Sequence, residues 1–435
     1  MASTQRTIQV QALARVEGEG AMTIRLKDDV VEDVELRIYE PPRFYEAFLR
    51  GRDAAETPDI TARICGICPV AYQMSAVHAI EQIYEIQITP TQRHLRRLLY
   101  CGEWIESHVL HAFFLHAPDF LGYPGALEMA RAKPELAELV KTALRVKKAG
   151  NSIVRAVGGR EVHPINVRVG GFYRLPRHDE LHALLPELTW SRSAVRGLLD
   201  WSTTLTYPDF EVDYQFVALQ HPDEYPMNGG RIVSSRGLNI DVCAFPDHFA
   251  EMQVPHSNAL QARLKSDGSS YFVGPLARWN LNHTYAPELV RQAAAAVGLT
   301  PPVRNPYRSL GVRLLEVLLA FDEAVRLIEA YEPQGPPTIP HQPRAGVGHA
   351  ATEAPRGLLY HRYETDNQGL LRTAVIVPPT SQNQAQIEAD LRQVAASLLP
   401  LSEEEATLKA EAIIRNYDPC ISCATHFLKM KVERR

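Results

Sequence analysis

Two Cys-x-x-Cys pairs at opposite ends of the chain constrain its fold more than any other feature. Cys65 and Cys68 lie in RICGIC, whereas Cys420 and Cys423 lie in DPCISC, close to the end of the 435 residues. In a protein with few other cysteines, such pairs usually bind a metal or carry out redox chemistry. If both pairs serve one centre, the fold must bring the two ends of the chain together.

The composition is typical of a soluble globular protein. Apolar residues make up 45% and charged residues 22% of the chain, and the formal net charge is −5, which does not favour nucleic-acid binding. The N-terminus has no apolar signal-peptide core, and no apolar run is long enough to cross a membrane. We therefore expect a cytoplasmic protein with no membrane span and no nucleic-acid partner.

The hydrophobic patterns predict an α+β fold that is mostly α-helical. Alternating residues over 7–40 favour an antiparallel sheet at the N-terminus. Helical periodicity covers about 69–148 and returns at 179–205, 285–298 and 308–331. We expect one large catalytic domain, residues 1–426, built on a bundle of long helices, followed by a C-terminal tail at 427–435.

A β-hairpin is predicted late in the chain. The stretches GLLYHRYE and LLRTAVIVPP flank TDNQG, a turn sequence that contains Asn367 and Gln368. Arg356 and Thr380 lie equally far from Gln368 on its two sides. The hairpin therefore brings Arg356 and Thr380 near each other at its open end.

Each cysteine pair adjoins a predicted helix end. Pro69 suits the first turn of a helix, which places Cys68 at the positive end, where a thiolate is stabilised. The second pair follows a helix that has Ser402 as its N-cap and must end before Asp418, because proline comes next. The terminal pair can therefore be buried beside a packed helix.

Four thiolates from these pairs could hold a structural zinc ion, an iron–sulfur cluster or a catalytic transition-metal centre. Zinc ligand pairs usually lie within a few tens of residues of each other, unlike the pairs in this chain. The cysteines alone leave all three alternatives open. The other two cysteines, Cys101 and Cys243, stand alone, and we expect both to be small buried apolar residues.

Both pairs and their flanking residues resemble the signature motifs of nickel–iron hydrogenase large subunits. The length of the chain is more similar to the cytoplasmic, NAD(P)-linked members than to the longer periplasmic ones. Five further segments resemble the family in the family's order: ARVEGEG (14–20), RFYEAFLRGRD (43–53), GEWIESHVLHAFFLHAPDF (102–120), APRGLLYH (354–361) and VPPTSQN (377–383).

The resemblance implies that all four cysteines bind nickel and that the second cysteine of each pair also bridges to iron. Cys65 and Cys420 would be terminal ligands, and Cys68 and Cys423 would be bridging ligands. The iron would carry carbon monoxide and cyanide ligands that the protein does not supply. Soft thiolates suit a metal centre that changes oxidation state.

The resemblance also implies catalytic roles for three residues outside the cysteine pairs. Glu17 matches the first proton acceptor and donor beyond the bridging thiolates. Arg356 matches the arginine above the open coordination site, with Asp418 as its carboxylate partner. Glu19 matches no motif position, and we expect it to be exposed.

The pocket around the iron is expected to include Thr380 as a donor to cyanide, with Pro355 and Pro379 shaping its wall. The chain departs from the family pattern at two positions. Tyr72 replaces a frequent histidine and can still donate a hydrogen bond toward a bridging thiolate, and Ser107 replaces an aspartate that often orients the arginine. Asp418 would then orient Arg356 with less help.

A second metal ion, magnesium or iron, is implied near the C-terminus. Its expected ligands are Glu46, His426 and the carbonyl group of Ile376. Few protein ligands suffice for an ion that keeps several waters. In contrast, we expect packing or hydrogen-bonding roles for the histidines of one helix, His108, His111 and His116.

The resemblance implies that this chain is the catalytic subunit of a hydrogenase that oxidises dihydrogen reversibly to protons and electrons. Because it has no further cysteine cluster, electrons would pass to an iron–sulfur small subunit, near His163, and then to flavin- and NAD(P)-reducing subunits. Nickel chaperones would load the centre, and a maturation endopeptidase would remove the tail after His426.

The alternatives are a hydrogen-sensing regulatory protein and a zinc-stapled structural subunit. A subunit of respiratory complex I is disfavoured, because that relative has lost these cysteines.

Overall fold

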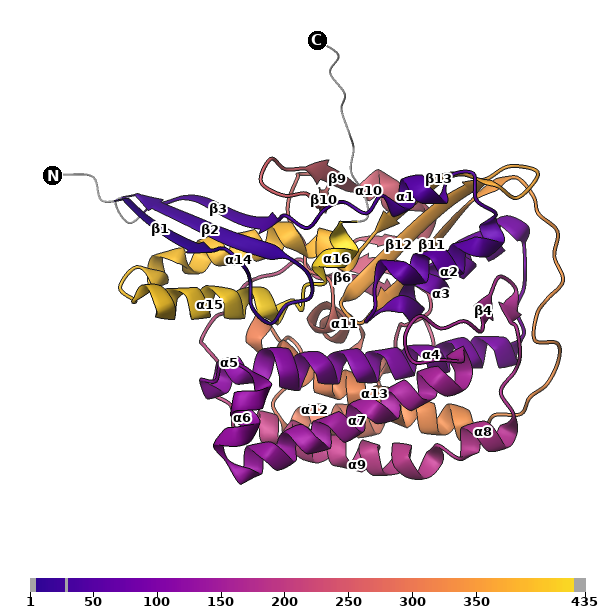
Figure 1. Ribbon diagram of the computed structural model, residues 1–435, viewed down its shortest axis with the longest axis horizontal. Helices are drawn as coiled ribbons and strands as arrows, with labels where there is room; N and C mark the ends of the chain where they lie inside the picture. The colour runs from indigo at the N-terminus through magenta and orange to yellow at the C-terminus, as the bar shows by residue number, and fades with distance from the viewer. Residues whose placement is uncertain (1–4, 28–29, 426–435) are drawn as a thin grey trace, which may run out of the picture.

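Long helices from the middle of the chain form one layer of the molecule, below several small antiparallel sheets in the view of Figure 1. The computed structural model describes residues 5–27 and 30–425. The layer of long helices consists of α4 (Pro90–Val109), α7 (Pro134–Gly158), α9 (Leu185–Ser202) and α13 (Ser309–Glu329). The prediction of a mostly helical α+β fold is confirmed.

The pairing of α4 with α7 depends on two glycines. A Cβ atom on Gly102 would lie 3.0 Å from the Gly150 carbonyl oxygen, and one on Gly150 would lie 2.8 Å from that of Gly102. Larger side chains would therefore push the two backbones apart. The start of α4 is fixed by a capping box between Thr89 and Gln92.

The predicted N-terminal sheet is present. It consists of β1 (Gln5–Val10), β2 (Gly20–Lys27) and β3 (Val30–Ile38), with β2 in the middle. Its strands pair antiparallel, so that Ile24 faces both Ile8 and Val34. These apolar side chains are buried. The sheet thus carries the loop 11–19, which contains Glu17, on its inner end.

The predicted hairpin is also present, as β12 (Gly357–Thr365) and β13 (Leu371–Val377). A third strand, β11 (Gly346–Ala354), extends it to a three-stranded sheet that the sequence did not reveal. The sequence of β11, GVGHAATEA, is rich in small residues and lacks a run of β-branched ones. Small residues are needed here because β11 packs on α3 (Pro69–Tyr84), where a Cβ on Gly348 would lie 1.9 Å from the Ala79 carbonyl oxygen.

The last helices return the chain to its beginning. In Figure 1, α14 (Pro379–Leu398) and α15 (Glu403–Asn416) lie beside the N-terminal sheet, and α16 (Ile421–Ala424) follows. Ser402 caps α15 with Glu405 in a capping box, and α15 ends before Asp418, as predicted. A parallel bridge between Glu17 and Cys420 joins the two ends directly.

The remaining elements are shorter and connect these parts. The shorter helices are α1 (Tyr45–Leu49), α2 (Thr57–Thr61), α5 (Ala117–Leu121), α6 (Ala126–Ala132), α8 (His178–His182), α10 (Phe245–His248), α11 (Pro275–Asn282) and α12 (Glu288–Ala296), with a π-helical segment at Leu110–His116. The shorter strands are β4 (Val167–Arg168), β5 (Gly171–Phe172), β6 (Val217–Gln220), β7 (Arg231–Ser234), β8 (Asn239–Ile240), β9 (Phe249–Gln253) and β10 (Leu260–Leu264).

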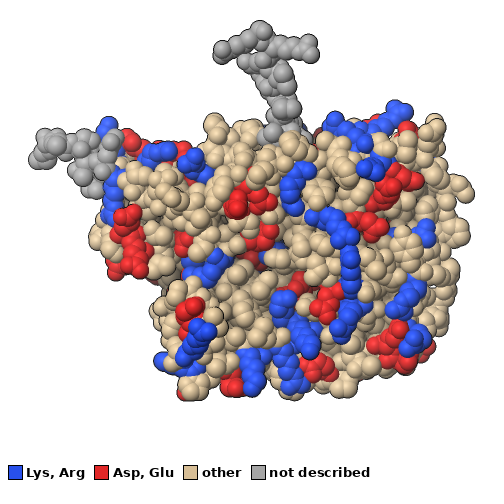
Figure 2. All heavy atoms as spheres, in the orientation of Figure 1, with Lys and Arg blue, Asp and Glu red and all other residues tan. Residues whose placement is uncertain are grey.

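The surface carries charges of both signs. On the face shown in Figure 2, lysine and arginine side chains are interspersed with aspartate and glutamate. Many of them pair, as Arg145 does with Glu187 at 2.8 Å. Among the described residues, no helix combines the length and apolar character needed to cross a membrane.

Candidate metal centre

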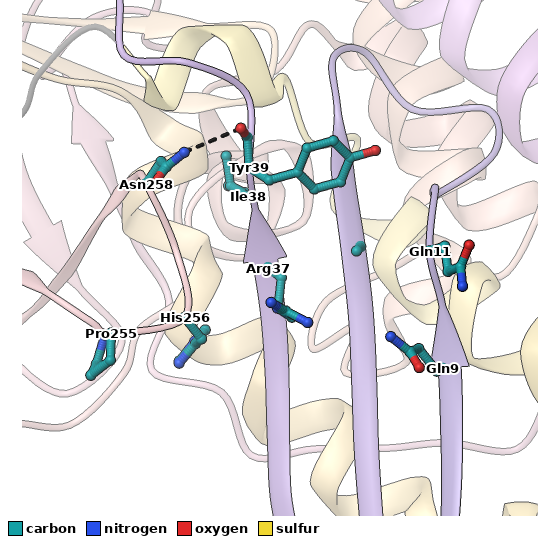
Figure 3. Close-up of a pocket in the computed structure, with 9 residues that line it drawn as sticks. Gln9, Gln11, Arg37, Ile38, Tyr39, Pro255, His256 and Asn258 are labelled. Atoms are coloured by element: carbon teal, nitrogen blue, oxygen red, sulfur yellow. Dashed lines mark hydrogen bonds between the residues drawn. The ribbon is translucent and has the colours of Figure 1, made fainter.

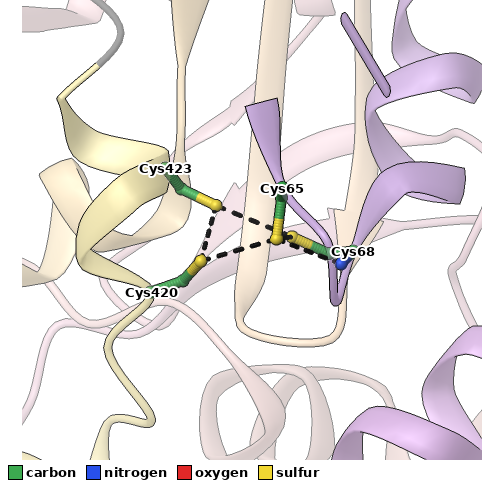
Figure 4. Close-up of side chains that lie close together, drawn as sticks. All are labelled: Cys65, Cys68, Cys420 and Cys423. Carbon is green, nitrogen blue, oxygen red and sulfur yellow. Dashed lines mark hydrogen bonds between the residues drawn. The ribbon is translucent and has the colours of Figure 1, made fainter. Parts of the chain in front are cut away.

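The four cysteines of the two pairs converge on one buried point (Figure 4). The sulfur of Cys65 lies 2.8 Å from that of Cys68 and 3.5 Å from that of Cys420. The sulfur of Cys423 lies 2.7 Å from that of Cys420 and 3.7 Å from that of Cys68. All four sulfurs lie within 4.8 Å of one another. Because metal–thiolate bonds are about 2.3 Å long, all four can reach one metal site.

Backbone geometry at two helix starts fixes these sulfurs. Cys68 is the N-cap of α3, with Pro69 in the first turn as predicted, and Cys420 is the N-cap of α16. The Cys65 sulfur accepts hydrogen bonds from the backbone N–H groups of Ile67 at 3.3 Å and Cys68 at 3.1 Å. The local fold therefore holds the donor set in place.

The protonation of the four thiols is uneven. Burial raises the pKa of Cys68, Cys420 and Cys423. Burial acts in the same direction on Cys65, but hydrogen bonds from the other three thiols and the charge of Arg356 outweigh it and hold the pKa of Cys65 well below its usual value. A metal that binds here must therefore displace protons from Cys68, Cys420 and Cys423.

Glu17 lies directly against the cysteine site. Its Oε2 atom accepts hydrogen bonds from the Cys420 thiol at 3.0 Å and from the Ser422 backbone N–H at 3.1 Å. The Glu17 carbonyl accepts a further bond from the Ile421 N–H at 2.9 Å. The carboxylate therefore contacts a sulfur that the resemblance makes a terminal ligand, rather than a bridging one.

Arg356 and Asp418 form a buried ion pair, and each is 3% exposed. The Arg356 Nε–H donates to the Asp418 carbonyl oxygen at 2.7 Å, and Nη2 donates to Oδ1 at 3.1 Å. Arg356 Nη1 is buried and has no hydrogen-bond partner among the described residues. A buried, unpaired guanidinium nitrogen beside four thiols suits an acceptor ligand on a bound metal.

Thr380 contacts the second cysteine pair. Its Oγ1 atom accepts a hydrogen bond from the backbone N–H of Cys420 at 3.0 Å, which leaves its own O–H free to donate. Pro379 opens α14, next to Thr380. Pro355 lies in the turn between β11 and β12, next to Arg356. The predicted proximity of Arg356 and Thr380 is consistent with the pairing of β12 and β13.

Two of the three predicted ligands of the second ion meet in the structure. Glu46, on α1, is buried, and its Oε1 atom accepts a hydrogen bond from the Ile376 backbone N–H at 2.7 Å. The observed contact thus uses the N–H group of Ile376, whereas the prediction concerned its carbonyl group. His426 lies outside the described residues, but the carbonyl of Thr425, just before it, accepts from the Arg43 N–H at 2.7 Å, close to α1.

Comparison with known proteins agrees with this geometry. The family described as nickel-dependent hydrogenase matches residues 43–143 and 312–426. The alpha subunit of sulfhydrogenase 2 from Pyrococcus furiosus is 33% identical over 431 residues, which cover 97% of this chain and all of the relative. The chain belongs to the nickel-dependent hydrogenase large-subunit family.

Other relatives support the same assignment. The beta subunit of the NAD-reducing hydrogenase HoxS from Cupriavidus necator is 28% identical, with 97% of this chain and 95% of the relative covered. A crystal structure of an NAD+-reducing [NiFe]-hydrogenase in the H2-reduced state is 27% identical, covers 98% of this chain and 100% of that chain, and superimposes with a TM-score of 0.87. The chain is thus the catalytic large subunit of a nickel–iron hydrogenase.

Two expectations about cysteines in this hydrogenase are wrong. Cys243 is exposed, because it lies in a short 3-10 turn at the surface, whereas Cys101 is buried as predicted. The Cys68 thiolate is not stabilised by the start of α3, since the pKa of Cys68 is raised. The largest cause is burial of the thiol. In addition, the Glu103 carboxylate accepts hydrogen bonds from the first N–H groups of α3, those of Val70 at 2.6 Å and Ala71 at 3.1 Å.

The two departures from the family pattern lie in the interior of the hydrogenase. Burial and the negative charge of Cys423 and Cys68 raise the pKa of Tyr72 well above its usual value, so that the phenol stays protonated beside the thiols. Ser107 is buried, and its hydroxyl has no hydrogen-bond partner among the described residues. Asp418 is therefore the residue that orients Arg356 here.

The histidines serve structure, as predicted. His108 bonds to Glu316 at 2.9 Å, and His111 bonds to the Arg415 carbonyl oxygen at 2.7 Å. The ring of His116 packs on that of His111. Burial lowers the pKa of His108 to about 4, so that it stays neutral at physiological pH. His163 bonds to the Ala62 carbonyl oxygen at 2.7 Å, just before the first cysteine pair.

Arg43 connects the two cysteine loops, and the sequence did not single it out. Its Nη2 atom donates to the Ile64 carbonyl oxygen at 2.7 Å and also to the Ser422 carbonyl oxygen. One side chain thus joins the loop of the first cysteine pair to that of the second. The available signal was its position at the start of the RFYEAFLRGRD motif, because a family motif outside the cysteine loops indicates a further contact with the site.

The site is buried and is separate from the surface pocket shown in Figure 3. That pocket, of about 450 Å³, lies between the N-terminal sheet and the loop before β10, and its lining includes Arg37, Tyr39, His256 and Asn258. None of the residues predicted for the metal centre lines it.

Proposed function

We propose that this hydrogenase oxidises dihydrogen reversibly to two protons and two electrons at a nickel–iron centre held by Cys65, Cys68, Cys420 and Cys423. The convergence of four buried sulfurs from the two ends of the chain is the observation that carries the proposal. The centre supplies, when bound, the Lewis-acid and redox chemistry that splits dihydrogen. The match to a nickel-dependent family favours this centre over the zinc alternative.

The four sulfurs and their neighbours divide the work of holding the centre. Cys65 and Cys420 would serve as terminal nickel ligands, and Cys68 and Cys423 would be shared between nickel and iron. The iron would carry carbon monoxide and cyanide. The unpaired Nη1 of Arg356 and the hydroxyl group of Thr380 are the donors available to cyanide nitrogens, and Pro355 and Pro379 close the pocket around them.

Protons leave by way of Glu17. Its carboxylate lies 3.0 Å from the Cys420 sulfur, within reach for direct proton transfer. The carboxylate is half-buried, whereas Glu19 is exposed, as predicted. Glu17 can therefore accept a proton from the sulfur and pass it toward the surface.

A magnesium or iron ion near the C-terminus would be held by Glu46, His426 and the carbonyl of Ile376. The buried Glu46 carboxylate, already in contact with the backbone of Ile376, supports this site. The ion would tie α1 and β13 to the end of the chain. Residues 1–426 would form the catalytic domain.

Electrons pass to an iron–sulfur small subunit, which His163 would contact, and from there to flavin- and NAD(P)-reducing subunits. Among the described residues, the four cysteines form the one group of three or more potential metal ligands, so a path of clusters within this part of the chain is not available. Similarity to an NAD-reducing hydrogenase supports NAD(P) as the final carrier and a cytoplasmic location.

Maturation would need nickel chaperones and an endopeptidase that removes residues 427–435, which lie outside the described residues. The site is closed by both ends of the chain, so a late cleavage would leave it accessible for metal loading. The intact mass of the active enzyme tests this. A mass that ends at Arg435, at full activity, would exclude obligatory cleavage.

The proposed function is tested on protein matured in its own host. We expect nickel and iron by elemental analysis, infrared bands of cyanide and carbon monoxide, and hydrogen-dependent reduction of NAD+ or NADP+ by the complex. Zinc alone without these bands would contradict the proposal. Intact bands with negligible turnover would favour the hydrogen-sensing alternative.

A further inference from the structure

Arg278, on α11, is completely buried and uses every donor it has. Its five N–H groups match five acceptors. Nε and Nη2 donate to the two carboxylate oxygens of Glu316 at 2.8 and 2.7 Å. Nη1 donates to Glu353 at 3.0 Å and to the Ala354 carbonyl at 2.9 Å, and Nη2 donates to the Pro355 carbonyl at 2.9 Å.

These carbonyl groups belong to the turn that carries Arg356. The two residues just before Arg356 thus have their carbonyl oxygens bound by Arg278. The other side of the turn meets Gly274, where a Cβ atom would lie 2.9 Å from the Arg356 carbonyl oxygen. The backbone of Arg356 is therefore enclosed between Arg278 on α11 and Gly274, the residue just before α11.

Buried side chains around Glu316 hold Arg278 itself in place. Glu316, on α13, accepts further hydrogen bonds from the Tyr225 hydroxyl at 2.8 Å and from His108 at 2.9 Å. The guanidinium carbon of Arg278 lies 4.4 Å from the centre of the Trp104 ring. All of these side chains are buried. The long-helix layer is thereby linked rigidly to the turn above the metal centre.

We propose that Arg278, anchored by Glu316, is a positioning residue that sets the place of the Arg356 guanidinium at the nickel–iron centre. This inference rests on the proposed role of Arg356. Among the described residues, the Arg356 side chain hydrogen-bonds to Asp418 alone, through two hydrogen bonds, and its Nη1 has no partner. The direction of Nη1 therefore depends on where the turn holds the backbone.

The first test is Arg278→Lys, which keeps the charge but cannot reach five acceptors. We expect nickel and iron contents like those of the wild type, shifted infrared cyanide bands, and turnover lower by about 10- to 100-fold, since a displacement near 1 Å has such effects. The matched control is Arg96→Lys. Arg96 is equally buried and donates two bonds to Glu81, at 2.7 and 2.5 Å, without a bond to the turn. The bands should not shift in this control.

A double variant separates positioning from general stability. If Arg278 acts through Arg356, then Arg278→Lys should cause no further loss of turnover in an Arg356→Lys background. Additive losses, or unshifted bands in assembled Arg278→Lys enzyme, would overturn the proposal. Glu316→Gln, which preserves size but removes one acceptor, should give an intermediate band shift.

The remaining outcomes are also informative. If neither Arg278→Lys nor Glu316→Gln assembles while Arg96→Lys does, Arg278 is a folding residue and the positioning role is wrong. If the wild type lacks nickel and cyanide bands, the proposed function fails and this inference fails with it. Wild-type bands that stay unshifted in Arg278→Lys contradict this inference alone.

Discussion

At the scale of single residues, neighbours decide the chemistry of each side chain. Glu17 and Glu19 are separated by one residue, yet Glu17 contacts the Cys420 thiol and Glu19 is exposed. Cys423 and Cys243 differ in the same way, because one is buried among thiols and the other lies at the surface. These contrasts supply matched pairs of variants.

Cys423→Ser should abolish the bimetallic centre. A serine hydroxyl is a harder and less acidic ligand than a thiol, so it cannot replace a bridging thiolate. We expect loss of nickel by elemental analysis and loss of the cyanide bands. Cys243→Ser, at the exposed cysteine, should leave both unchanged. Normal hydrogen uptake by Cys423→Ser would contradict the bridging role.

Glu17→Gln should block proton transfer while the centre still assembles. Glutamine preserves size and can accept the hydrogen bond from the Ser422 N–H, but it cannot carry a proton at neutral pH. We expect turnover to fall about 100-fold or more, at normal nickel content. Glu19→Gln is the control and should match the wild type. A Glu17→Gln enzyme with wild-type turnover would exclude this proton path.

At the scale of elements, the site depends on where helices and strands end. The cysteines lie at the starts of α3 and α16, and Arg356 lies in the turn between β11 and β12. Helix ends and turns present backbone donors and side chains toward a shared point, whereas helix interiors bond to themselves. An element that loses its cap should therefore loosen the site from a distance.

Ser402→Ala tests this for α15, which leads to Asp418. The Ser402 hydroxyl oxygen accepts a hydrogen bond from the Glu405 N–H at 3.2 Å, and the Glu405 carboxylate accepts one from the Ser402 N–H at 3.0 Å. Loss of the cap should cost about 1 kcal/mol. Faster hydrogen exchange of the first-turn amides of α15 is the expected result. Ser193→Ala, at an exposed position inside α9, should leave exchange in α15 unchanged; an equal effect would refute capping as the cause.

The mostly helical layer could be predicted, and strand β11 could not. Long periodic segments such as α13 carry their own signal, because one helix must bury one face wherever it packs. The small residues of β11 have no such pattern. Gly348 is required only because the backbone of Ala79 lies against it, and a contact between distant segments is not visible in a local sequence window.

At the scale of the whole molecule, the candidate metal centre joins segments from the two ends of the chain. Residues near Glu17, the first cysteine pair, the Arg356 turn and the second pair all meet at one point. A metal bound there would join segments that are otherwise linked through the full length of the chain. Metal binding and folding of the chain ends should therefore be coupled.

Nickel retention by the hydrogenase should increase with pH. The pKa of Cys68, Cys420 and Cys423 is raised by burial, so in the metal-free site these thiols are protonated at neutral pH and protons compete with the metal. Lowering the pH should release nickel. The measurement is nickel content after incubation with a chelator across a pH series. Retention that is independent of pH, or better in acid, would contradict the assignment.

The sequence by itself predicted the candidate ligand set and determined the type of fold. Cysteine spacing, the flanking motifs and hydrophobic periodicity are local properties, and each constrains its own segment regardless of distant neighbours. They predicted the four cysteines, Glu17, Arg356 and the hairpin that brings Arg356 toward Thr380.

Only the tertiary structure decided which groups support those residues. That Glu103 accepts the first N–H groups of α3, that Arg43 joins both cysteine loops, and that Arg278 holds the turn before Arg356 all result from contacts between distant segments. A buried charged side chain is stable only where hydrogen-bonding or oppositely charged groups surround it. These groups come from distant segments, so no local sequence pattern reveals them. The identity of the metal ligands is therefore local, whereas their orientation is a property of the whole fold.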